Sequence, residues 1–388
     1  MQPMKAILLN TIRSPALDRL LKRSEQIELC ARFDRCPEQL PVCVLDNSVR
    51  EHTNPLRAES FDGTELWQAA TDSGADAILF AVPNPSLKQV CEAFRDIPGV
   101  QGYVLPFYSA TDSALDAAAD LTDLLIPIDL GKPRLKMVQI NLAEHCNLNC
   151  KGCANYSSLV KQPECSSYAQ VARDLRRLRS FFWGIETVKL MGGEPLLNPE
   201  AARYPGLVRR LFPDSRIELG TNGLLLGPRQ GLLLEAMRQA HAEFVISLYP
   251  GTRARKEQLE ELLHREKVAY RLFEFRGQFL KYLYERPVYT PEEGYLHCPA
   301  RECHCLENGW LAVCGRPLYL HRLNRAFGTA IPDGEGKWNI HTLELDPWKL
   351  DRLLRTPIDT CRYCGPRCRF DWQPGAGRPP EKQDWIVD

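Results

Sequence analysis

The amino-acid sequence predicts an α/β protein built from three consecutive parts, and three observations lead to this prediction. Short apolar runs alternate with helical patterns over residues 1–130, and the same alternation returns over residues 131–285. Such alternation is typical of parallel sheets wrapped by helices. Residues 286–388 are instead rich in Pro, Gly and Cys and show little periodicity, which indicates a small domain folded around metal. A chain of 388 residues is long enough for such a division.

Charge and apolar content exclude several classes of partner. The 49 basic residues balance the 49 acidic ones, so no overall field draws the protein to nucleic acid or to anionic lipid. No apolar run is long enough to span a bilayer, and the N-terminus lacks the pattern of a signal peptide. We therefore expect a cytoplasmic protein with no membrane and no nucleic-acid partner.

The chain contains 15 cysteines, which in a reducing compartment favours metal binding or catalysis over disulfides. Their distribution agrees, because three lie within residues 146–153 and seven within residues 298–368. The other five are most simply small buried apolar residues: Cys30, Cys36, Cys43, Cys91 and Cys165.

The first part, residues 1–130, is expected to form a Rossmann-like domain. Its strands are predicted at 5–10, 27–33, 41–46, 75–83 and 100–106, and its helices at 14–23, 63–74 and 86–97. The turn after the first strand reads "NTIRSPA" and has no glycine, so the G-x-G-x-x-G signature of dinucleotide binding is missing. The segment resembles the Rossmann-like N-terminal domain of sugar-modifying acyltransferases, with Asp46 ending a strand. A docking or scaffold domain fits these residues equally.

The second part, residues 131–285, is expected to form a parallel barrel or part of one. Strands are predicted at 136–143, 187–193, 216–223, 243–250 and 268–275, with helices near 168–182, 200–211, 228–240 and 254–266. In such barrels the chemistry lies at the carboxyl ends of the strands. A cysteine loop follows the first of these strands, "GGEP" the second, "TNG" the third and "SLYP" the fourth. All the unusual residues therefore fall on one rim.

The cysteine loop places Cys146, Cys150 and Cys153 at spacings of four and three. Three thiolates leave one iron of a [4Fe–4S] cluster free to bind a ligand that is not protein. This loop after the first strand, with "GGEP" after the second, resembles the radical S-adenosylmethionine (radical SAM) enzymes over roughly residues 134–275. The resemblance implies a partial (β/α)6 barrel as the core of the chain.

The resemblance also implies cofactors and site residues. The three cysteines would hold the cluster, its open iron would chelate S-adenosylmethionine, and reductive cleavage would give a 5′-deoxyadenosyl radical that abstracts a substrate hydrogen. The segment expected near the methionine amino group is Gly192, Gly193, Glu194 and Pro195. Residues expected to contact the ribose and the carboxylate are Thr221, Asn222 and Ser247. Ordinary hydrogen bonding at strand ends is the alternative for Asn222 and Ser247.

One position departs from the family pattern. The residue before the third cysteine is usually aromatic and lies near adenine, but here it is Gly152. We expect Tyr156, just after the loop, to replace that ring.

The C-terminal cysteines resemble the auxiliary-cluster domains called SPASM and twitch. A glycine turn at Gly309 precedes Cys314, and "CRYCGPRC" adds a CxxC pair and one more cysteine. The expected ligands of one auxiliary [4Fe–4S] cluster are Cys298, Cys314, Cys361 and Cys364. The surplus cysteines, any of which could exchange with Cys298 or Cys364, are Cys303, Cys305 and Cys368. A structural zinc site is the alternative.

The surplus thiols and the residues after Cys314 are the candidate catalytic groups. A thiol near a substrate radical can donate a hydrogen atom, which would make the reaction an epimerisation; an unused buried cysteine is the alternative. Arg316 and His321 belong to a basic segment that either lines a polar pocket or forms a solvated helix face. In a pocket they would help to deprotonate a substrate hydroxyl, for which histidine is the better suited.

Three functions remain open at this stage. The first is hydrogen abstraction from a sugar, nucleotide-sugar or aminocyclitol, giving dehydrogenation or epimerisation, with the auxiliary cluster as electron acceptor as in aminocyclitol alcohol dehydrogenases. The second is maturation of a ribosomally made peptide, although residues 1–130 do not resemble a winged-helix peptide clamp. The third is a non-enzymatic iron–sulfur or zinc module. We favour the first, with a small-molecule substrate and an electron donor such as flavodoxin or ferredoxin.

Overall fold

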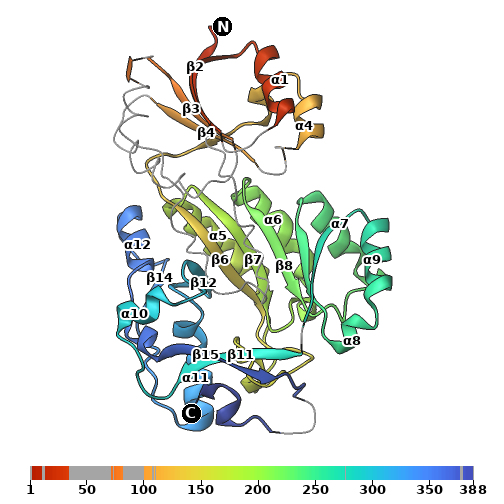
Figure 1. The fold of residues 1–388 in the computed structure, drawn as a ribbon, viewed down its shortest axis with the longest axis vertical. Coiled ribbons are helices and arrows are strands. Elements are labelled where there is room, and N and C mark those ends of the chain that lie inside the picture. Colours follow the sequence, from red (N-terminus) through yellow and green to blue (C-terminus); the bar gives the residue numbers. More distant parts are fainter. Residues whose placement is uncertain are drawn as a thin grey trace. The chain divides into compact units, whose positions relative to one another are not determined.

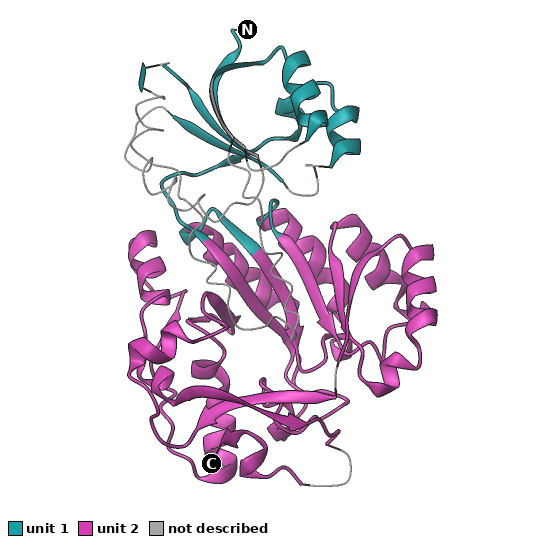
Figure 2. Ribbon diagram, in the orientation of Figure 1, with its two compact units in different colours: residues 1–134, 181–186, 212–215 teal, residues 135–180, 187–211, 216–388 magenta. Residues whose placement is uncertain are grey.

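The computed structural model describes residues 2–10, 14–34, 71–72, 74–81, 100–106, 109, 111–275, 277–375 and 379–387. The chain divides into two compact units, which Figure 2 colours separately. Unit 1 comprises residues 1–134, 181–186 and 212–215, and unit 2 comprises residues 135–180, 187–211 and 216–388. The predicted strand at 41–46, the helix at 86–97, most of the helix at 63–74 and Asp46 lie outside the described residues.

Unit 1 contains the parallel sheet that the sequence predicts. Its strand order is β2-β1-β3-β4-β5, formed by β1 (Met4–Asn10), β2 (Ile27–Asp34), β3 (Ala77–Ala81), β4 (Gln101–Leu105) and β5 (Ile126–Ile128). The first four strands are parallel, and β5 runs antiparallel to β4. Apolar residues of β1 and β3 pack against the buried face of α1 (Pro15–Arg23). The α/β fold class is thus confirmed for this part of the chain.

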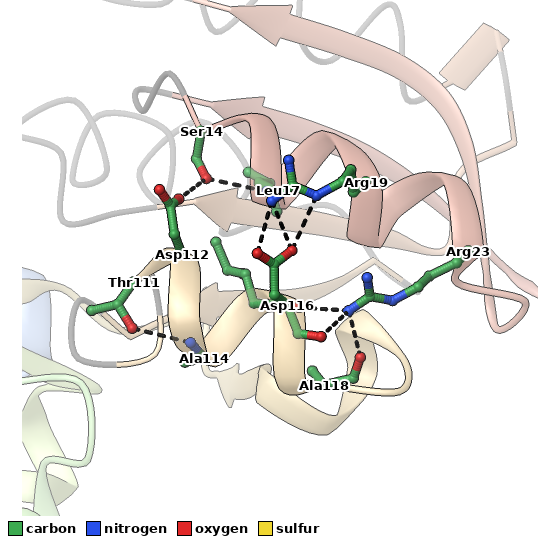
Figure 3. A network of polar contacts seen from close by, with 10 residues as sticks. Ser14, Leu17, Arg19, Arg23, Thr111, Asp112, Ala114, Asp116 and Ala118 are labelled. Carbon is green, nitrogen blue, oxygen red and sulfur yellow. Dashed lines mark hydrogen bonds and ion pairs between the residues drawn. The ribbon is translucent and has the colours of Figure 1, made fainter.

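A network of polar contacts joins α1 to α4 (Asp112–Ala117), as Figure 3 shows. Ser14 caps α1 by accepting a backbone N–H of the first turn at 3.2 Å, and its hydroxyl donates to Asp112 at 2.8 Å. Arg19 donates to both carboxylate oxygens of Asp116, and Arg23 donates to carbonyl groups at the C-terminal end of α4. These contacts fix how the two helices face each other. Because the charges of Arg19 and Asp116 are exposed, their ion pair adds little stability.

Unit 2 is organised around an eight-stranded sheet with the order β10-β9-β8-β7-β6-β12-β13-β14. Its consecutive strands are β6 (Arg134–Ala143), β7 (Gly184–Gly192), β8 (Arg216–Thr221), β9 (Glu243–Ser247) and β10 (Ala269–Phe273). They alternate along the chain with α5 (Tyr168–Phe181), α6 (Tyr204–Leu211), α7 (Gly231–Gln239), α8 (Pro250–Arg253) and α9 (Lys256–Arg265) (Figure 1). The pairs β7–β8, β8–β9 and β9–β10 are parallel, which matches the expected strand–helix core. Among the described strands the sheet is open.

The C-terminal residues extend this same sheet. Strand β12 (Cys303–Glu307) pairs in parallel with β6, and β13 (Trp310–Ala312) and β14 (Lys337–Asn339) continue antiparallel beyond it. The turn between β12 and β13 contains Gly309 at a φ of +80°, which confirms the predicted glycine hairpin. Residues 286–388 therefore share a sheet with the barrel strands, and the proposed boundary near residue 286 stays a prediction.

Three helices and a second sheet complete unit 2. The helices are α10 (Pro291–Leu296), α11 (Arg316–Phe327) and α12 (Pro347–Leu354). The second sheet has the order β15-β11-β16 and consists of β11 (Gln278–Tyr284), β15 (Cys364–Asp371) and β16 (Ile386–Val387). No helix among the described residues is long and apolar enough to cross a membrane.

Candidate active site

The cysteine loop begins directly after β6, at the carboxyl end of the strand. Cys150 is buried with 7% exposure, and Cys146 and Cys153 are half-buried. Burial raises the pKa of the Cys146 thiol to about 11 and that of Cys150 to about 12. Binding of iron to these thiols must therefore release protons, so assembly is favoured at higher pH.

The glycines of "GGEP" allow two backbone segments to approach closely. Gly193 donates its N–H to the Ala143 carbonyl at 2.8 Å, and Glu194 donates its N–H to the His145 carbonyl at 3.0 Å. A Cβ on Gly192 would lie 2.2 Å from the Ala143 oxygen, and one on Gly193 would lie 2.1 Å from the His145 oxygen. Only glycine fits at both positions, so the segment after β7 is locked to the start of the cysteine loop.

Glu194 is fully buried, and its carboxylate is held by donors from two neighbouring strand ends. It accepts the Thr221 hydroxyl at 2.7 Å, the Asn222 N–H at 2.8 Å and the Leu196 N–H at 3.1 Å. Burial raises the pKa of Glu194, and these three donors oppose the shift. A carboxylate has about four acceptor positions. Glu194 thus joins β7 to β8 and keeps one acceptor position for a further donor.

Asn222 connects this network to the first cysteine. Its side-chain Nδ2 donates to Asn147 at 2.7 Å and lies 3.7 Å from the Cys146 sulfur, while its side-chain Oδ1 accepts the Leu224 N–H at 3.0 Å. Pro195 begins a short 3-10 helix capped by Glu194, and Ser247 is the last residue of β9. The structure therefore brings the expected rim residues of β7 and β8 together around the loop; their contacts with S-adenosylmethionine stay predictions.

A buried lysine in the loop bears on whether the site suits an anionic group. Lys151 is 5% exposed, and its Nζ has no hydrogen-bond partner among the described residues. A buried ammonium group without a partner is costly unless a negative charge compensates it. A cluster held by the three thiolates of the same loop would supply negative charge. The residues of the loop thus fit a [4Fe–4S] cluster at Cys146, Cys150 and Cys153.

The structure explains Gly152 and does not support the role expected of Tyr156. Gly152 has a φ of +65°, and a Cβ there would lie 2.4 Å from the ring of Phe370 and 2.5 Å from the Asp384 carbonyl oxygen. Tyr156 is fully buried in an apolar cluster, where its ring stacks on Trp385 with 6.3 Å between ring centroids. Its ring has no exposed face for adenine, because it forms part of the core.

Aromatic residues of the C-terminal segment contact the cysteine loop, and sequence reasoning missed them. Trp372 donates its Nε1–H to the Cys150 sulfur at 3.0 Å, and Trp385 donates to the Cys153 carbonyl at 2.8 Å. Tyr249, which follows β9, lies 5.3 Å from Trp372 between ring centroids and is close enough for the cysteines to raise its pKa, although burial is the main cause. More than 200 residues separate each tryptophan from its cysteine, so no local spacing could have indicated these contacts.

The residue of helix α11 that contacts the cysteine loop is Arg322, whereas Arg316 and His321 were expected. Arg322, 9% exposed, donates to the Glu144 carboxylate at 2.6 Å and to the Asn155 carbonyl at 3.2 Å. Glu307 lies beside this pair, and burial together with the charge of Glu144 raises its pKa to about 8. The hydroxyl of Tyr319, 1% exposed, has no partner among the described residues. Two carboxyl groups, one guanidinium and a phenol thus gather next to the cysteine loop.

The two basic residues proposed as catalytic lie elsewhere. His321 is exposed on α11. Arg316 hydrogen-bonds the Tyr156 hydroxyl and lies over the Tyr282 ring, 5.0 Å from its centroid. Burial and the charges of three C-terminal cysteines raise the pKa of Tyr282, so Arg316 belongs to the surroundings of those cysteines. The structure gives neither residue a position suited to deprotonating a substrate held at the cysteine loop.

Four of the seven C-terminal cysteines lie near one another. Burial raises the pKa of the Cys298 thiol to about 11 and the pKa of Cys314 well above its usual value. The charges of Cys361 and Cys364 add to both shifts, which shows that the four sulfurs are neighbours. Among the described residues no three His, Cys, Asp or Glu side chains converge on a single metal ion. In a four-iron cluster each thiolate binds a separate iron, so the four sulfurs need not converge on a single metal ion.

The three surplus cysteines lie on two strands, Cys303 and Cys305 on β12 and Cys368 on β15. Cys305 is 2% exposed within an apolar cluster on β12. Cys303 lies near the charges of Lys189 and Glu218, and Cys368 pairs with Lys281 across β15 and β11. Burial raises the pKa of Cys305, the charges of Cys303 and Cys314 add to this shift, and a Cβ on Gly315, next to Cys314, would lie 3.6 Å from the Cys305 sulfur. Cys305 thus lies near Cys303 and Cys314, whereas Cys368 belongs to the other sheet of unit 2.

Comparison with known proteins agrees with this geometry. Residues 140–267 match the family model described as "Radical SAM superfamily". The chain is 32% identical over 111 residues to a probable GTP 3′,8-cyclase of Methanocella arvoryzae, a match that covers 28% of this chain and 34% of that protein. It is 32% identical over 130 residues to the GTP 3′,8-cyclase of Aquifex aeolicus, covering 31% of this chain and 38% of that protein. The chain thus spans about a third of the length of the curated relatives it matches.

Solved structures give a weaker likeness. The crystal structure of BtrN in complex with AdoMet and 2-DOIA matches with a TM-score of 0.38 at 16% identity, covering 66% of this chain and 100% of that one. Streptococcus suis SuiB bound to S-adenosylmethionine matches with a TM-score of 0.30 at 16% identity, covering 36% of this chain and 34% of that one. The family match rests on the sequence of the core, where the cysteine loop, "GGEP" and the ends of β7 and β8 come together. Residues 140–267 of this chain form a domain of the Radical SAM superfamily, whose cofactors are a [4Fe–4S] cluster and S-adenosylmethionine.

Proposed function

We propose that this protein is a radical SAM enzyme that abstracts hydrogen from a polar small molecule, such as a sugar, nucleotide-sugar or aminocyclitol, giving dehydrogenation or epimerisation. The observation that carries the proposal is the joining of the cysteine loop to the ends of β7 and β8 within a domain of that superfamily. When bound, the cluster supplies an electron that cleaves S-adenosylmethionine and so yields the hydrogen-abstracting radical. The chain's own residues bind and orient the cofactors and the substrate, and they exclude water from the site.

Each rim residue has a defined task in this proposal. Cys146, Cys150 and Cys153 hold the cluster, and the glycine backbone of "GGEP" keeps the loop in place through the two hydrogen bonds from Gly193 and Glu194. The remaining acceptor position of Glu194 suits an ammonium group. The buried Lys151 ammonium balances the negative charge of the site.

The polar group beside the loop supports a polar substrate. Glu144, Glu307 and Arg322 offer acceptors and donors for hydroxyl groups, at a site with little exposure. A carboxyl group with a pKa of about 8 is suited to proton transfer near neutral pH, so Glu307 is better placed than His321 to take the proton of a substrate hydroxyl. Glu144 and Arg322 pair with each other, whereas the buried Oε1 of Glu307 has no partner among the described residues, and a polar substrate would supply one.

The C-terminal cysteines are assigned to electron transfer. Cys298, Cys314, Cys361 and Cys364 hold an auxiliary [4Fe–4S] cluster in this proposal, and their proximity supports that assignment. A dehydrogenation leaves one electron on the substrate after a hydrogen atom and a proton have left. A cluster held by these four cysteines would supply the acceptor for that electron. We therefore favour dehydrogenation.

Two other activities remain candidates. The curated relatives are named GTP 3′,8-cyclases, but the similarity covers about a third of their length and coincides with the radical SAM core. Shared cofactor chemistry explains that similarity without a shared substrate. Peptide maturation is the other candidate. Incubation with GTP, with amino sugars and with candidate precursor peptides, followed by mass spectrometry of the products, separates the three.

The central test is cofactor cleavage by anaerobically reconstituted and reduced protein. We expect wild type to convert S-adenosylmethionine to 5′-deoxyadenosine and methionine, and the variant with Cys146, Cys150 and Cys153 all changed to alanine to form neither. Cys165→Ala is the matched control, because this exposed thiol lies outside both cysteine groups. Undiminished cleavage by the triple variant would refute the proposal.

Metal content tests the second site independently. Wild type should hold about eight irons, as two clusters of four, and the triple variant about four. Zinc in the triple variant, in place of iron, would show that the C-terminal cysteines form a structural zinc site.

Turnover in deuterated water tests the reaction type. Thiol hydrogens exchange with solvent, so an epimerase that uses Cys303, Cys305 or Cys368 as hydrogen donor would place deuterium at the product carbon. We expect no such deuterium. Its presence, and its loss when one of these cysteines becomes alanine while both clusters persist, would establish epimerisation instead.

A further inference from the structure

The C-terminal segment after β15 lies along the cysteine loop. Gly375 donates its N–H to the Leu148 carbonyl at 3.1 Å, and Lys151 donates its N–H to the Gln373 carbonyl at 3.2 Å. A Cβ on Gly375 would lie 1.9 Å from the Asn149 carbonyl oxygen, so the two backbones touch. These contacts fix the segment next to Cys150.

Within this segment Trp372 is the residue whose side chain reaches a sulfur. Its Nε1–H donates to the Cys150 Sγ at 3.0 Å. Its ring packs against Tyr249 and Phe275, at centroid distances of 5.3 and 5.6 Å. The backbone contacts and the packed ring together give the indole a defined direction, so the donor is aimed at the sulfur.

Trp385 provides an internal comparison. It also donates an indole N–H to the cysteine loop, but to the Cys153 carbonyl oxygen, at 2.8 Å. Its ring packs against Tyr156 and Phe327. Both tryptophans therefore donate an indole N–H to the cysteine loop, but of these two bonds only the one from Trp372 ends on a sulfur.

We propose that the hydrogen bond from Trp372 to the Cys150 sulfur raises the reduction potential of the cluster bound at Cys146, Cys150 and Cys153. The inference rests on the proposed function, in which Cys150 ligates that cluster. Reduction adds a negative charge that spreads onto the sulfurs, and a donor aimed at a sulfur stabilises the reduced form more than the oxidised form. The bond makes it easier for the external electron donor to reduce the cluster before S-adenosylmethionine is cleaved. Trp372 acts through the cluster and is not itself a catalytic residue.

The test compares Trp372→Phe with Trp385→Phe in the full-length, reconstituted protein. The midpoint potential is measured by redox titration, with electron paramagnetic resonance as the readout. The cluster with the open iron is identified as the signal that changes when S-adenosylmethionine is added and that is missing from the triple cysteine variant. A further variant carries benzothienylalanine at position 372, in which a ring sulfur replaces the N–H and the shape of the indole is kept.

We expect loss of the N–H at position 372 to reduce the ratio of reduced to oxidised cluster about tenfold at a fixed potential, which corresponds to a midpoint about 59 mV more negative. Trp385→Phe should shift the midpoint potential by less than a third of that amount. Equal midpoints for wild type and both position-372 variants would overturn the inference while leaving the cluster assignment intact. Failure of the proposed function is distinguishable, because the triple cysteine variant would then retain all of its iron and the signal that responds to S-adenosylmethionine would be missing from wild type.

Discussion

Replacing Glu194 by glutamine tests the buried network that joins β7 to β8. The carboxylate accepts three hydrogen bonds: Thr221 and Leu196 donate to one oxygen, and Asn222 donates to the other. A glutamine amide has one oxygen and one NH2 group. In either orientation the NH2 group faces a backbone N–H, either that of Leu196 or that of Asn222. The Thr221 hydroxyl can rotate, but a backbone N–H cannot.

Glu194→Gln therefore leaves one buried backbone donor, that of Leu196 or of Asn222, without an acceptor. Such a loss costs about 1–3 kcal/mol. We expect the free energy of unfolding of metal-free protein, measured by urea denaturation with tryptophan fluorescence, to fall by that amount. Glu235→Gln is the matched control: this half-buried residue pairs with Arg238 on the surface of α7, and because solvent screens such a pair, its loss should change the stability little.

A result within error of the Glu235→Gln control would refute the reasoning. It would mean that burial raises the pKa of Glu194 above the pH of the measurement, so that the carboxyl group is already protonated in the folded protein. The cysteine loop gives a second measurement, because a displaced "GGEP" segment should also slow the formation of 5′-deoxyadenosine by the reconstituted variant.

Three further changes have defined outcomes. Gly193→Ala puts a Cβ 2.1 Å from the His145 carbonyl oxygen, so we expect at least tenfold slower cleavage of S-adenosylmethionine; an unchanged rate would show that the loop can move aside. His304 is fully buried, and burial lowers its pKa from 6.5 to about 4, so its contribution to stability is complete above pH 6.5 and is lost as the pH falls toward 4. Urea titrations should show a loss on the order of 3 kcal/mol across that interval in wild type but not in His304→Gln, and parallel pH profiles would contradict this. Arg322→Met should destabilise the protein by about 1–3 kcal/mol, because it leaves Glu144 without its counter-charge, and adding Glu144→Gln should recover part of the loss; strict additivity of the two changes would show that the pair is not coupled.

Local features of the sequence were sufficient for the core of the protein. The alternation of apolar runs and helical patterns gave strands at β6 to β10 and helices at α5, α7 and α9, because the periodicity of buried residues is a local property. The spacing of the three cysteines and the position of "GGEP" at a strand end led to the superfamily, since parallel strands bring their carboxyl ends to one rim.

Longer-range contacts were not predictable from spacing. The sequence indicated that Glu194 faces a ligand, which stays a prediction; it did not indicate that the carboxylate also accepts hydrogen bonds from Thr221 and Asn222, which belong to the next strand end. On α11 the residue that faces the loop is Arg322 and not His321, a choice set by which helix face packs against the sheet. Tyr156 lies in the core because it packs against residues distant in the sequence, among them Trp385.

The sequence by itself determined the parallel α/β core, the cysteine loop and the glycines that let it close, since each depends on neighbouring residues or on one strand and its turn. Only the tertiary structure decided that β12 extends the core sheet beside β6, that a C-terminal segment covers the loop, and that Trp372 donates to a sulfur 222 residues away. Pairings at such separations depend on which buried faces and unpaired backbone groups meet when the whole chain packs, and that information is distributed over the fold.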